Sequence, residues 1–162
     1  MNKAIFLDRD GVLINNLHQY YIWKSDQLEF VEGVFENLQL LQKKGFQLFI
    51  VSNQGGIARG LYSIDDVLKL HHELIATFRK NHIVITEILF CPHHNDKEKC
   101  LCRKPEPLMI EKLIAKYNLK KNESVMIGDN ESDMEAATRA GIAGIKILPN
   151  KNMFPFITTL LQ

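Results

Sequence analysis

The stretch Ala4-Ile5-Phe6-Leu7-Asp8-Arg9-Asp10-Gly11 places an apolar run directly before two carboxylates and a glycine. Four contiguous apolar residues predict a strand that is buried on both faces, as in a parallel sheet. The charged residues and the glycine predict a loop at the carboxyl end of this strand. Ligand sites of open parallel sheets lie in such loops, so the stretch indicates both a fold class and the place of a site.

The rest of the chain repeats this alternation. Further strands are predicted over residues 47–52, 84–91, 124–128 and 142–148, and helices over 34–44, 63–80, 106–118, 131–140 and 154–161. Ser63 is a predicted N-cap, and Asp66 three residues later is a near-variant of a capping box. The pattern indicates an α/β, Rossmann-like, doubly wound sheet that is mostly parallel, with helices on both faces. We expect residues 1–162 to form a single domain, because no repeat or flexible linker interrupts them.

The composition is that of an ordinary globular protein, with 46% apolar and 24% charged residues. A net charge of +1 provides no basic surface, which argues against nucleic-acid or membrane partners. Residues 1–10 have the features of neither a signal peptide nor a membrane span. We therefore expect a cytoplasmic protein that acts as a monomer on a small molecule.

Polar residues follow four of the predicted strands. Asp8 and Asp10 follow the first, Ser52 and Asn53 the second, Arg103 and Lys104 the loop after the third, and Asp129 and Asp133 the fourth. Because the carboxyl ends of parallel strands meet at one edge of a sheet, these side chains are expected to converge. Taken singly, residues 8–11 could form a plain turn and the later aspartates could cap a helix. Their coincidence at one edge favours a functional site.

The residue types indicate phosphoryl transfer. Asp8, Asp10 and Asp129 offer the hard oxygen ligands that suit Mg²⁺. Asp8 could then act as the nucleophile and form an aspartyl-phosphate. Asp10 could protonate the leaving alcohol and later activate the hydrolytic water. The Ser52 hydroxyl and Lys104 could hold the transferring phosphoryl oxygens.

The three cysteines lie close together in the sequence, at Cys91, Cys100 and Cys102. Their odd number and their clustering argue against a disulfide framework and favour a metal site. With His93 they would form a closed Cys₃His zinc site. His93 is preferred to His94 because alternate residues of an extended segment point the same way. Three reduced cysteines beside an exposed histidine pair are the alternative.

Four segments together resemble the motifs of the haloacid dehalogenase superfamily of phosphatases, in the family order: Asp8-Arg9-Asp10-Gly11-Val12, Ser52-Asn53, Lys104, and Gly128-Asp129 with Asp133. Cys91-Pro92-His93-His94, Cys100-x-Cys102-Arg103-Lys104-Pro105 and residues 53–60 are similar to its histidinol-phosphatase-related branch. The resemblance implies a capless fold with a zinc-binding loop and Mg²⁺-dependent hydrolysis of a phosphomonoester. It implies that Asp133 supports the Mg²⁺ site from a second layer. It also implies substrate contacts from Asn16, His18, Gln19, Ser52, Asn53, Gln54, Arg59 and Arg103.

Within this branch the sequence favours removal of the 7-phosphate of a D-glycero-D-manno-heptose 1,7-bisphosphate. Histidinol phosphate is the alternative substrate, although no clear acidic contact for its cation is seen. A zinc-knuckle binding module or an inactive scaffold are more distant alternatives. Ser52 replaces a usual threonine and keeps the hydroxyl, whereas Gly55 replaces a usual serine and loses one. Leu108 replaces a usual glycine without an evident consequence.

Overall fold

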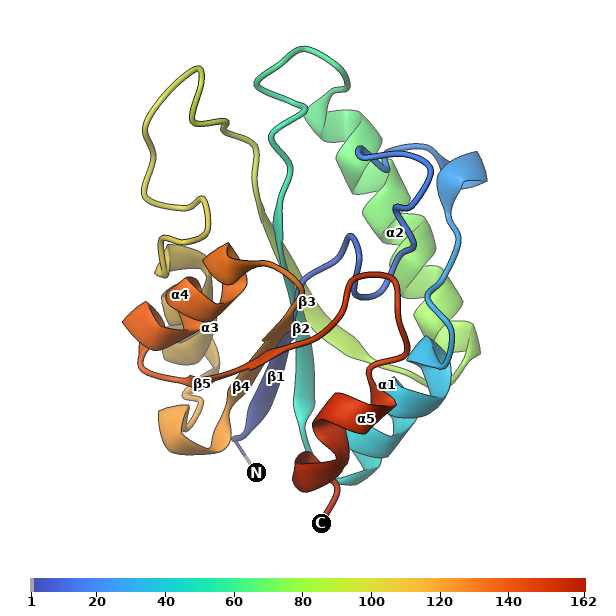
Figure 1. Ribbon diagram of the computed structural model, residues 1–162, viewed down its shortest axis with the longest axis vertical. Coiled ribbons are helices and arrows are strands. Elements are labelled where there is room, and N and C mark those ends of the chain that lie inside the picture. Colours follow the sequence, from blue (N-terminus) through green and yellow to red (C-terminus); the bar gives the residue numbers. More distant parts are fainter. Residues whose placement is uncertain (1) are drawn as a thin grey trace.

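The computed structural model, which describes residues 2–162, has one sheet between two layers of helices (Figure 1). Its strands are β1 (Ala4–Leu7), β2 (Gln47–Asn53), β3 (Ile85–Cys91), β4 (Val125–Gly128) and β5 (Ala143–Lys146). They lie in the order β3-β2-β1-β4-β5, and every pairing is parallel. The first strand is central, with Phe6 beside Phe49 on one side and Met126 on the other. This arrangement confirms the predicted doubly wound sheet.

The helices begin close to the predicted positions, and all but α5 end close to them. They are α1 (Val34–Lys43), α2 (Ile64–Lys80), α3 (Leu108–Tyr117), α4 (Glu131–Ala140) and α5 (Phe154–Ile157). Ser63 accepts a hydrogen bond from the Asp66 N–H, and the Asp66 carboxylate accepts one from the Ser63 N–H. The capping box at the start of α2 is thus confirmed. Single turns of 3₁₀ helix at Ser25–Gln27 and Lys121–Glu123 were not predicted, because one turn has no measurable periodicity. A third such turn, Thr158–Leu160, follows α5 within the helix predicted over 154–161.

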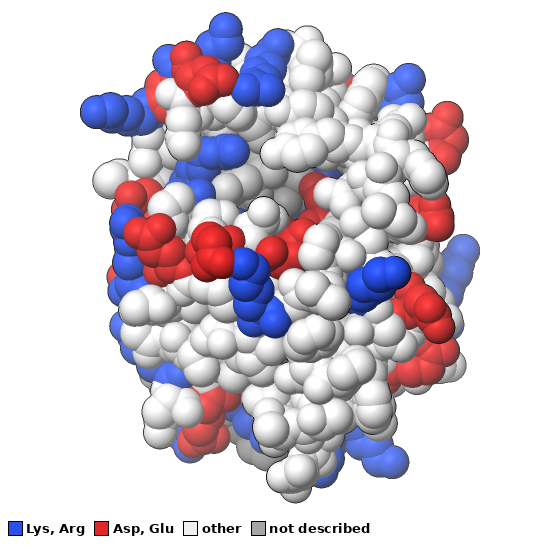
Figure 2. All heavy atoms as spheres, viewed as in Figure 1, with Lys and Arg blue, Asp and Glu red and all other residues white. Residues whose placement is uncertain are grey.

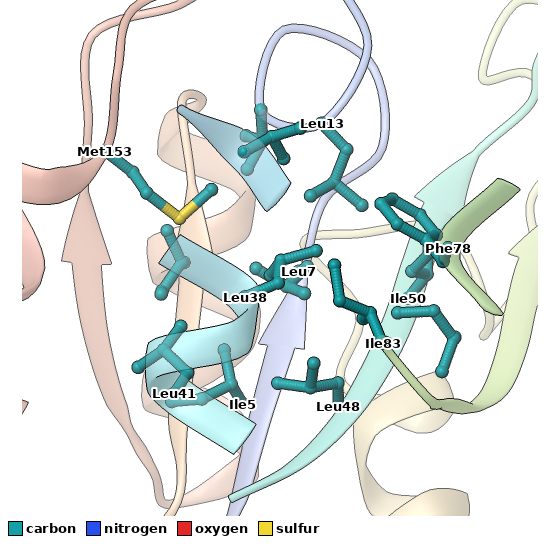
Figure 3. Close-up of a cluster of buried hydrophobic side chains, with 14 of the residues drawn as sticks. Ile5, Leu7, Leu13, Leu38, Leu41, Leu48, Ile50, Phe78, Ile83 and Met153 are labelled. Atoms are coloured by element: carbon teal, nitrogen blue, oxygen red, sulfur yellow. The ribbon is translucent and has the colours of Figure 1, made fainter. Parts of the chain in front are cut away.

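Two apolar cores lie on opposite faces of the sheet. Ile5 and Leu7 point to the core beneath α1, α2 and α5, where they lie near Leu38 and Phe78 (Figure 3). The alternate residues Ala4 and Phe6 point to the second core, with side chains from α3 and α4. Each fully buried aliphatic or aromatic side chain stabilises the fold by about 1.5–3 kcal/mol. Burial on both faces explains why β1 is apolar throughout.

Loops rise from the carboxyl ends of the strands (Figure 1). Between β1 and α1 the described chain holds only a loop with the single turn Ser25–Gln27, so no cap domain is inserted there. Cys91 is the last residue of β3, and the loop that follows carries Cys100 and Cys102 and ends at α3. Residues 91–102 are called the cysteine loop. Among residues 2–162, no helix is both long enough and apolar enough to cross a membrane.

Candidate active site

A buried ion-pair cluster lies at the end of β1. The Lys104 Nζ is 2.8 Å from the Asp8 Oδ1 and 2.6 Å from the Asp133 Oδ1, and it donates to the Val51 carbonyl at 2.8 Å. Burial alone would lower the pKa of Lys104, but the charges of Asp133 and Asp8 outweigh burial and raise it. Lys104 is therefore a fixed ammonium that connects its own predicted motif with those of Asp8 and Asp133.

Three carboxylates gather around this position. Asp8, Asp129 and Asp133 each offer an oxygen, and these oxygens lie within 4.8 Å of one another. Burial raises the pKa of Asp8 to about 7, against the opposing charge of Lys104. Burial and the charge of Asp133 also raise the pKa of Asp129. A bound cation would reverse both shifts, and the oxygen donors are those that Mg²⁺ prefers, so the residues fit this ion.

Two glycines allow these carboxylates to approach the strand ends. A Cβ atom on Gly11 would lie 2.5 Å from the Asp129 Oδ2, and one on Gly128 would lie 2.3 Å from the Asp133 Oδ2. Gly11 also has a φ of +84°, which residues other than glycine rarely adopt. Any larger residue at these positions would displace a carboxylate from the cluster.

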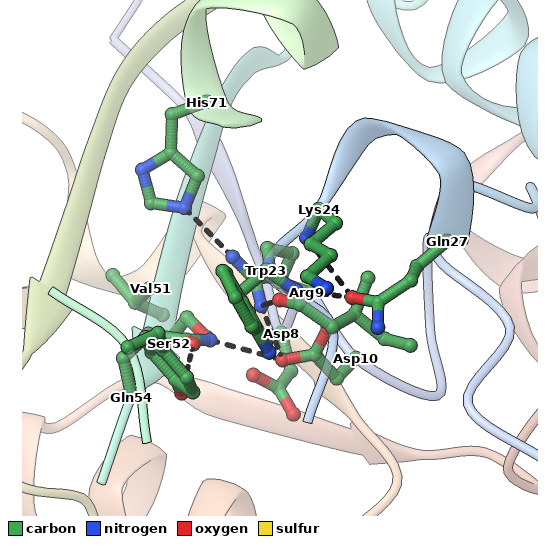
Figure 4. Close-up of polar contacts among 12 residues, drawn as sticks. Asp8, Arg9, Asp10, Trp23, Lys24, Gln27, Val51, Ser52, Gln54 and His71 are labelled. Carbon is green, nitrogen blue, oxygen red and sulfur yellow. Dashed lines mark hydrogen bonds and ion pairs between the residues drawn. The ribbon is translucent and has the colours of Figure 1, made fainter. Parts of the chain in front are cut away.

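The Asp10 carboxylate lies in a different hydrogen-bond network (Figure 4). Arg9 donates from Nε to the Asp10 Oδ1 at 3.0 Å and from Nη2 to the Asp10 Oδ2 at 2.9 Å. Gln54 donates a third hydrogen bond to the Asp10 Oδ2 at 2.9 Å. The clustered carboxylates are those of Asp8, Asp129 and Asp133, whereas the predicted Mg²⁺ ligands are Asp8, Asp10 and Asp129. Arg9 holds the Asp10 side chain, and Asp133 lies in the cluster itself.

The last two residues of β2 serve two purposes. Ser52 is buried, and its hydroxyl oxygen accepts a hydrogen bond from the Gln54 Nε2 at 2.8 Å. The Ser52 proton is therefore still available to a phosphate oxygen. Asn53 exchanges two hydrogen bonds of 3.0 Å with the main chain of Lys104. Asn53 thus positions the segment that carries Lys104, in addition to lining the pocket.

A pocket of about 490 Å³ opens above the carboxylates. Figure 2 shows a hollow in this face of the molecule with both acidic and basic atoms near its edge. The predicted residues that line it are Asp8, Asp10, Asn16, Asn53, Gln54, Arg103, Lys104, Asp129 and Asp133. Residues that the sequence analysis did not assign also line it, among them Tyr20, Tyr21, His94, Asn130, Ser132 and Asn150. Their types are common in loops, and only the folded chain brings them together.

Four predicted substrate contacts do not line this pocket. Ser52 is buried and contacts Gln54, which is a lining residue. His18 and Gln19 line a separate cavity of about 330 Å³, because the loop after β1 turns them away from the strand end. The Arg59 Nη2 lies 2.6 Å from the Asp96 Oδ2, and its Nη1 donates to the Tyr21 hydroxyl at 3.2 Å. Arg59 therefore links the cysteine loop to the loop that carries Tyr21, and it does not line the pocket.

The cysteine loop brings together the four predicted ligands. The Cys91 Sγ is 3.6 Å from the Cys100 Sγ and 3.1 Å from the Cys102 Sγ, and the His93 Nδ1 is 3.5 Å from the Cys91 Sγ. Four ligands around zinc, at bond lengths of about 2.3 Å to sulfur, would be separated by about 3.6–3.8 Å. The thiols are free, so the cluster fits a tetrahedral metal ion. His94 faces away from it and accepts a hydrogen bond from the Asp96 N–H.

Comparison with known proteins decides the family. A family model described as HAD-hydrolase-like matches residues 101–153. The chain is 42% identical to the D-glycero-alpha-D-manno-heptose-1,7-bisphosphate 7-phosphatase of Campylobacter jejuni, over 92% of this chain and 83% of that protein. The chain belongs to this family of haloacid dehalogenase-like phosphatases. The enzyme is also 38% identical to the D-glycero-beta-D-manno-heptose-1,7-bisphosphate 7-phosphatase of Haemophilus influenzae, over 88% of this chain and 79% of that protein.

Solved structures agree with this assignment. The phosphatase superposes on the D,D-heptose 1,7-bisphosphate phosphatase from B. bronchiseptica, solved in complex with magnesium and phosphate, with a TM-score of 0.84. The two are 27% identical, and the match covers 97% of this chain and 86% of the other. A putative HAD-like phosphatase from Mesorhizobium loti, 24% identical with a TM-score of 0.85 over 99% of this chain and 84% of the other, shares the fold. The predicted family, fold and enzyme class are confirmed.

Proposed function

We propose that this phosphatase removes the 7-phosphate of D-glycero-D-manno-heptose 1,7-bisphosphate through an aspartyl-phosphate on Asp8. The observation that carries the proposal is the contact between Asp8 and Lys104, at the floor of a pocket whose other polar residues include Arg103 and Asn16. The names of the relatives supply the substrate class. Histidinol phosphate is the rival substrate that an assay must exclude.

Asp8 and Lys104 perform the first step in this proposal. The Asp8 carboxylate attacks phosphorus, the phosphorus–oxygen bond to the sugar breaks, and the phosphoryl group remains on Asp8. Lys104 favours the ionised form of Asp8 and lies where it can pair with a phosphoryl oxygen. Ser52 would donate its free proton to another of these oxygens. Mg²⁺ held by Asp8, Asp129 and Asp133 would offset the charge of the phosphate as the carboxylate approaches.

Asp10 is the proposed acid and base. It would give a proton to the leaving sugar oxygen and then take one from the water that hydrolyses the aspartyl-phosphate. Arg9 and Gln54 hold its carboxylate at the edge of the same pocket that Asp8 lines. The Asp10 carboxylate does not belong to the cluster of Asp8, Asp129 and Asp133. Its side chain is therefore better suited to proton transfer than to metal binding.

We also propose a structural zinc ion at Cys91, His93, Cys100 and Cys102. The four ligand atoms converge within 4.8 Å of one another. The site is closed by four protein ligands, so it would order the loop and take no part in the chemistry. Because all the groups named above come from one chain, we propose that residues 1–162 act as a single-domain monomer. The reduced thiols favour the cytoplasm.

The test is phosphate release in the presence and absence of Mg²⁺. Both anomers of the heptose bisphosphate, histidinol phosphate and an aryl phosphate are compared at equal concentration. We expect Mg²⁺-dependent release, with a preference for one bisphosphate anomer. Preference for histidinol phosphate would overturn the substrate but keep the mechanism. Absence of release from every compound would overturn the proposed function.

A further inference from the structure

Arg9 is a fully buried arginine directly beside the catalytic strand end. Its guanidinium contacts both oxygens of the Asp10 carboxylate, donates to the Ile22 carbonyl at 2.6 Å, and lies 3.1 Å from the His71 Nε2 through Nη1. Burial of an arginine is costly unless its donors are paired. The chain therefore pairs this cation on three sides, and only one of these partners belongs to the proposed reaction.

The two contacts to Asp10 fix the plane of its carboxylate. A guanidinium that donates two parallel hydrogen bonds defines an orientation that a lysine could not impose. Gln54 adds a third donor at the Asp10 Oδ2, and the Tyr62 hydroxyl in turn donates to the Gln54 Oε1 at 2.9 Å. The geometry of Asp10 thus depends on where Arg9 is held.

His71 on α2 holds the Arg9 guanidinium from one side, through its contact with Nη1 (Figure 4). An arginine can only donate, so the His71 Nε2 must be an unprotonated acceptor and the ring must be the neutral Nδ1–H tautomer. Burial and the charge of Arg9 lower the pKa of His71 to about 3, in agreement with a neutral ring. The edge of the ring packs against Phe90 at a centroid distance of 5.4 Å, which restricts its rotation.

We propose that His71 is a positioning residue for Asp10, and that it acts through Arg9. The inference rests on the proposed function, because it takes Asp10 as the acid of the first step. The His71 Nε2 keeps the Arg9 guanidinium in the orientation that aligns the Asp10 carboxylate with the leaving oxygen. His71 itself is one residue further from the chemistry and lines neither of the two pockets described above.

The leaving group separates this role from a merely structural one. A sugar alkoxide needs a proton as it departs, whereas an aryl oxide with electron-withdrawing groups leaves as a stable anion. Loss of alignment at Asp10 should therefore reduce kcat/KM for the sugar phosphate and spare kcat/KM for 4-nitrophenyl phosphate. General acid catalysis contributes about 10²–10⁴-fold, and a misplaced group loses part of this. The parameter kcat/KM is chosen because it reports the steps up to transfer of the phosphoryl group.

The experiment compares four variants with the wild type on both substrates. His71→Phe keeps a ring but removes the acceptor, and His71→Gln restores an acceptor close to the place of Nε2. Asp10→Asn is the benchmark for loss of the acid, and His72→Gln, on the exposed face of α2, is the matched control. We expect His71→Phe to lower kcat/KM for the bisphosphate by about 10- to 100-fold and that for the aryl phosphate by less than about threefold. His71→Gln should recover most of the loss.

Each outcome has a distinct meaning. Equal losses on both substrates, or full activity of folded His71→Phe, would overturn the positioning role while Asp10→Asn still showed the leaving-group effect. Failure of His71→Gln to recover activity would also overturn it. If Asp10→Asn itself lost activity equally on both substrates, the proposed role of Asp10 would fail instead. Thermal melting of each variant identifies losses that come from unfolding.

Discussion

The Lys104 ammonium lies between two buried carboxylates, those of Asp8 and Asp133, and this arrangement has consequences for stability as well as catalysis. Asp133 also caps α4, because its Oδ2 accepts from the Asn130 N–H at 3.1 Å. The start of α4 is thereby joined to Asp8 through Lys104. The same contacts that hold Asp8 in place thus contribute to the fold.

Replacement of Lys104 by methionine should be strongly destabilising. It leaves Asp8 and Asp133 buried without their cation, which costs about 3–5 kcal/mol of unfolding free energy. Lys116→Met is the matched control, since its ion pair with Glu87 is exposed and such pairs contribute about 0–1 kcal/mol. Urea unfolding in magnesium-free buffer measures both variants. Equal losses in the two would contradict the buried-cluster account.

His71 should make the stability depend on pH. Its pKa of about 3 in the folded state lies below the ordinary value of 6.5, so the unfolded chain binds more protons between these values. Its contribution is complete above pH 6.5 and is lost as the pH falls toward 3, with a slope of up to about 1.4 kcal/mol per pH unit. His71→Gln should reduce the slope measured by urea unfolding from pH 4 to 7. An unchanged slope would show that His71 is not kept neutral by the fold.

Gly55 has a clear role at the residue scale. A Cβ atom there would lie 2.6 Å from the His94 Cδ2 and 3.0 Å from the Arg103 Nη1, both in pocket-lining side chains. Gly55→Ala should therefore raise KM for the bisphosphate by about tenfold, roughly the effect of one weakened polar contact, with kcat nearly kept. Steady-state kinetics with a melting curve provide the measurement. A variant with wild-type KM would show that neither side chain contacts substrate.

The cysteine loop acts as one element. It ends at Cys102, and the next two residues are Arg103 and Lys104, so disorder in the loop would reach Lys104 directly. Cys91 is fully buried and packs in the core on the α3 and α4 face, which anchors the loop to the sheet. Arg59 holds its outer part through Asp96. Metal binding would thus be coupled to the position of Lys104.

Removal of one ligand tests this coupling. Cys100→Ser should lower zinc content, reduce the melting temperature by roughly 5 °C or more, and lower kcat in saturating Mg²⁺. Leu101→Ser is the control, because Leu101 is 72% exposed between two of the ligands. Elemental analysis and thermal melting measure both. If Cys100→Ser kept both its melting temperature and its activity, a structural metal at this loop would be ruled out.

Helices and strands could be predicted because burial imposes a period on the sequence, as in α1, where Val34, Leu38 and Leu41 face the core. The convergence of Asp8, Lys104 and Asp129 could be predicted because parallel strands bring their carboxyl ends together. The loop contacts could not, since the path of residues 15–29 depends on long-range bonds such as that from the Asn16 N–H to the Asn150 side chain. His18 and Gln19 line the other cavity for this reason. The hydrogen bonds from Arg9 to Asp10 could not be predicted either, because the spacing of residues in the sequence gives no sign of them.

At the scale of the whole molecule, the apolar cores and the pocket occupy different parts of the fold. Two cores on opposite faces fix β1 along its length, and the pocket lies beyond its last residue. Loops after β1, β2, β3 and β4 each supply a side chain to this pocket, so the site exists only in the complete fold. Variation in these loops could change the substrate without a change in the core.

The most direct test of the central claim is to trap the phosphorylated enzyme. The protein is quenched with acid during turnover of the heptose bisphosphate in Mg²⁺, reduced with borohydride, and digested for mass spectrometry. Borohydride converts an aspartyl-phosphate to homoserine, so the account predicts homoserine at position 8, and none in Asp8→Asn or without Mg²⁺. Homoserine at another aspartate, or its absence from position 8 while phosphate is released and the intermediate is stable to quenching, would contradict Asp8 as the nucleophile.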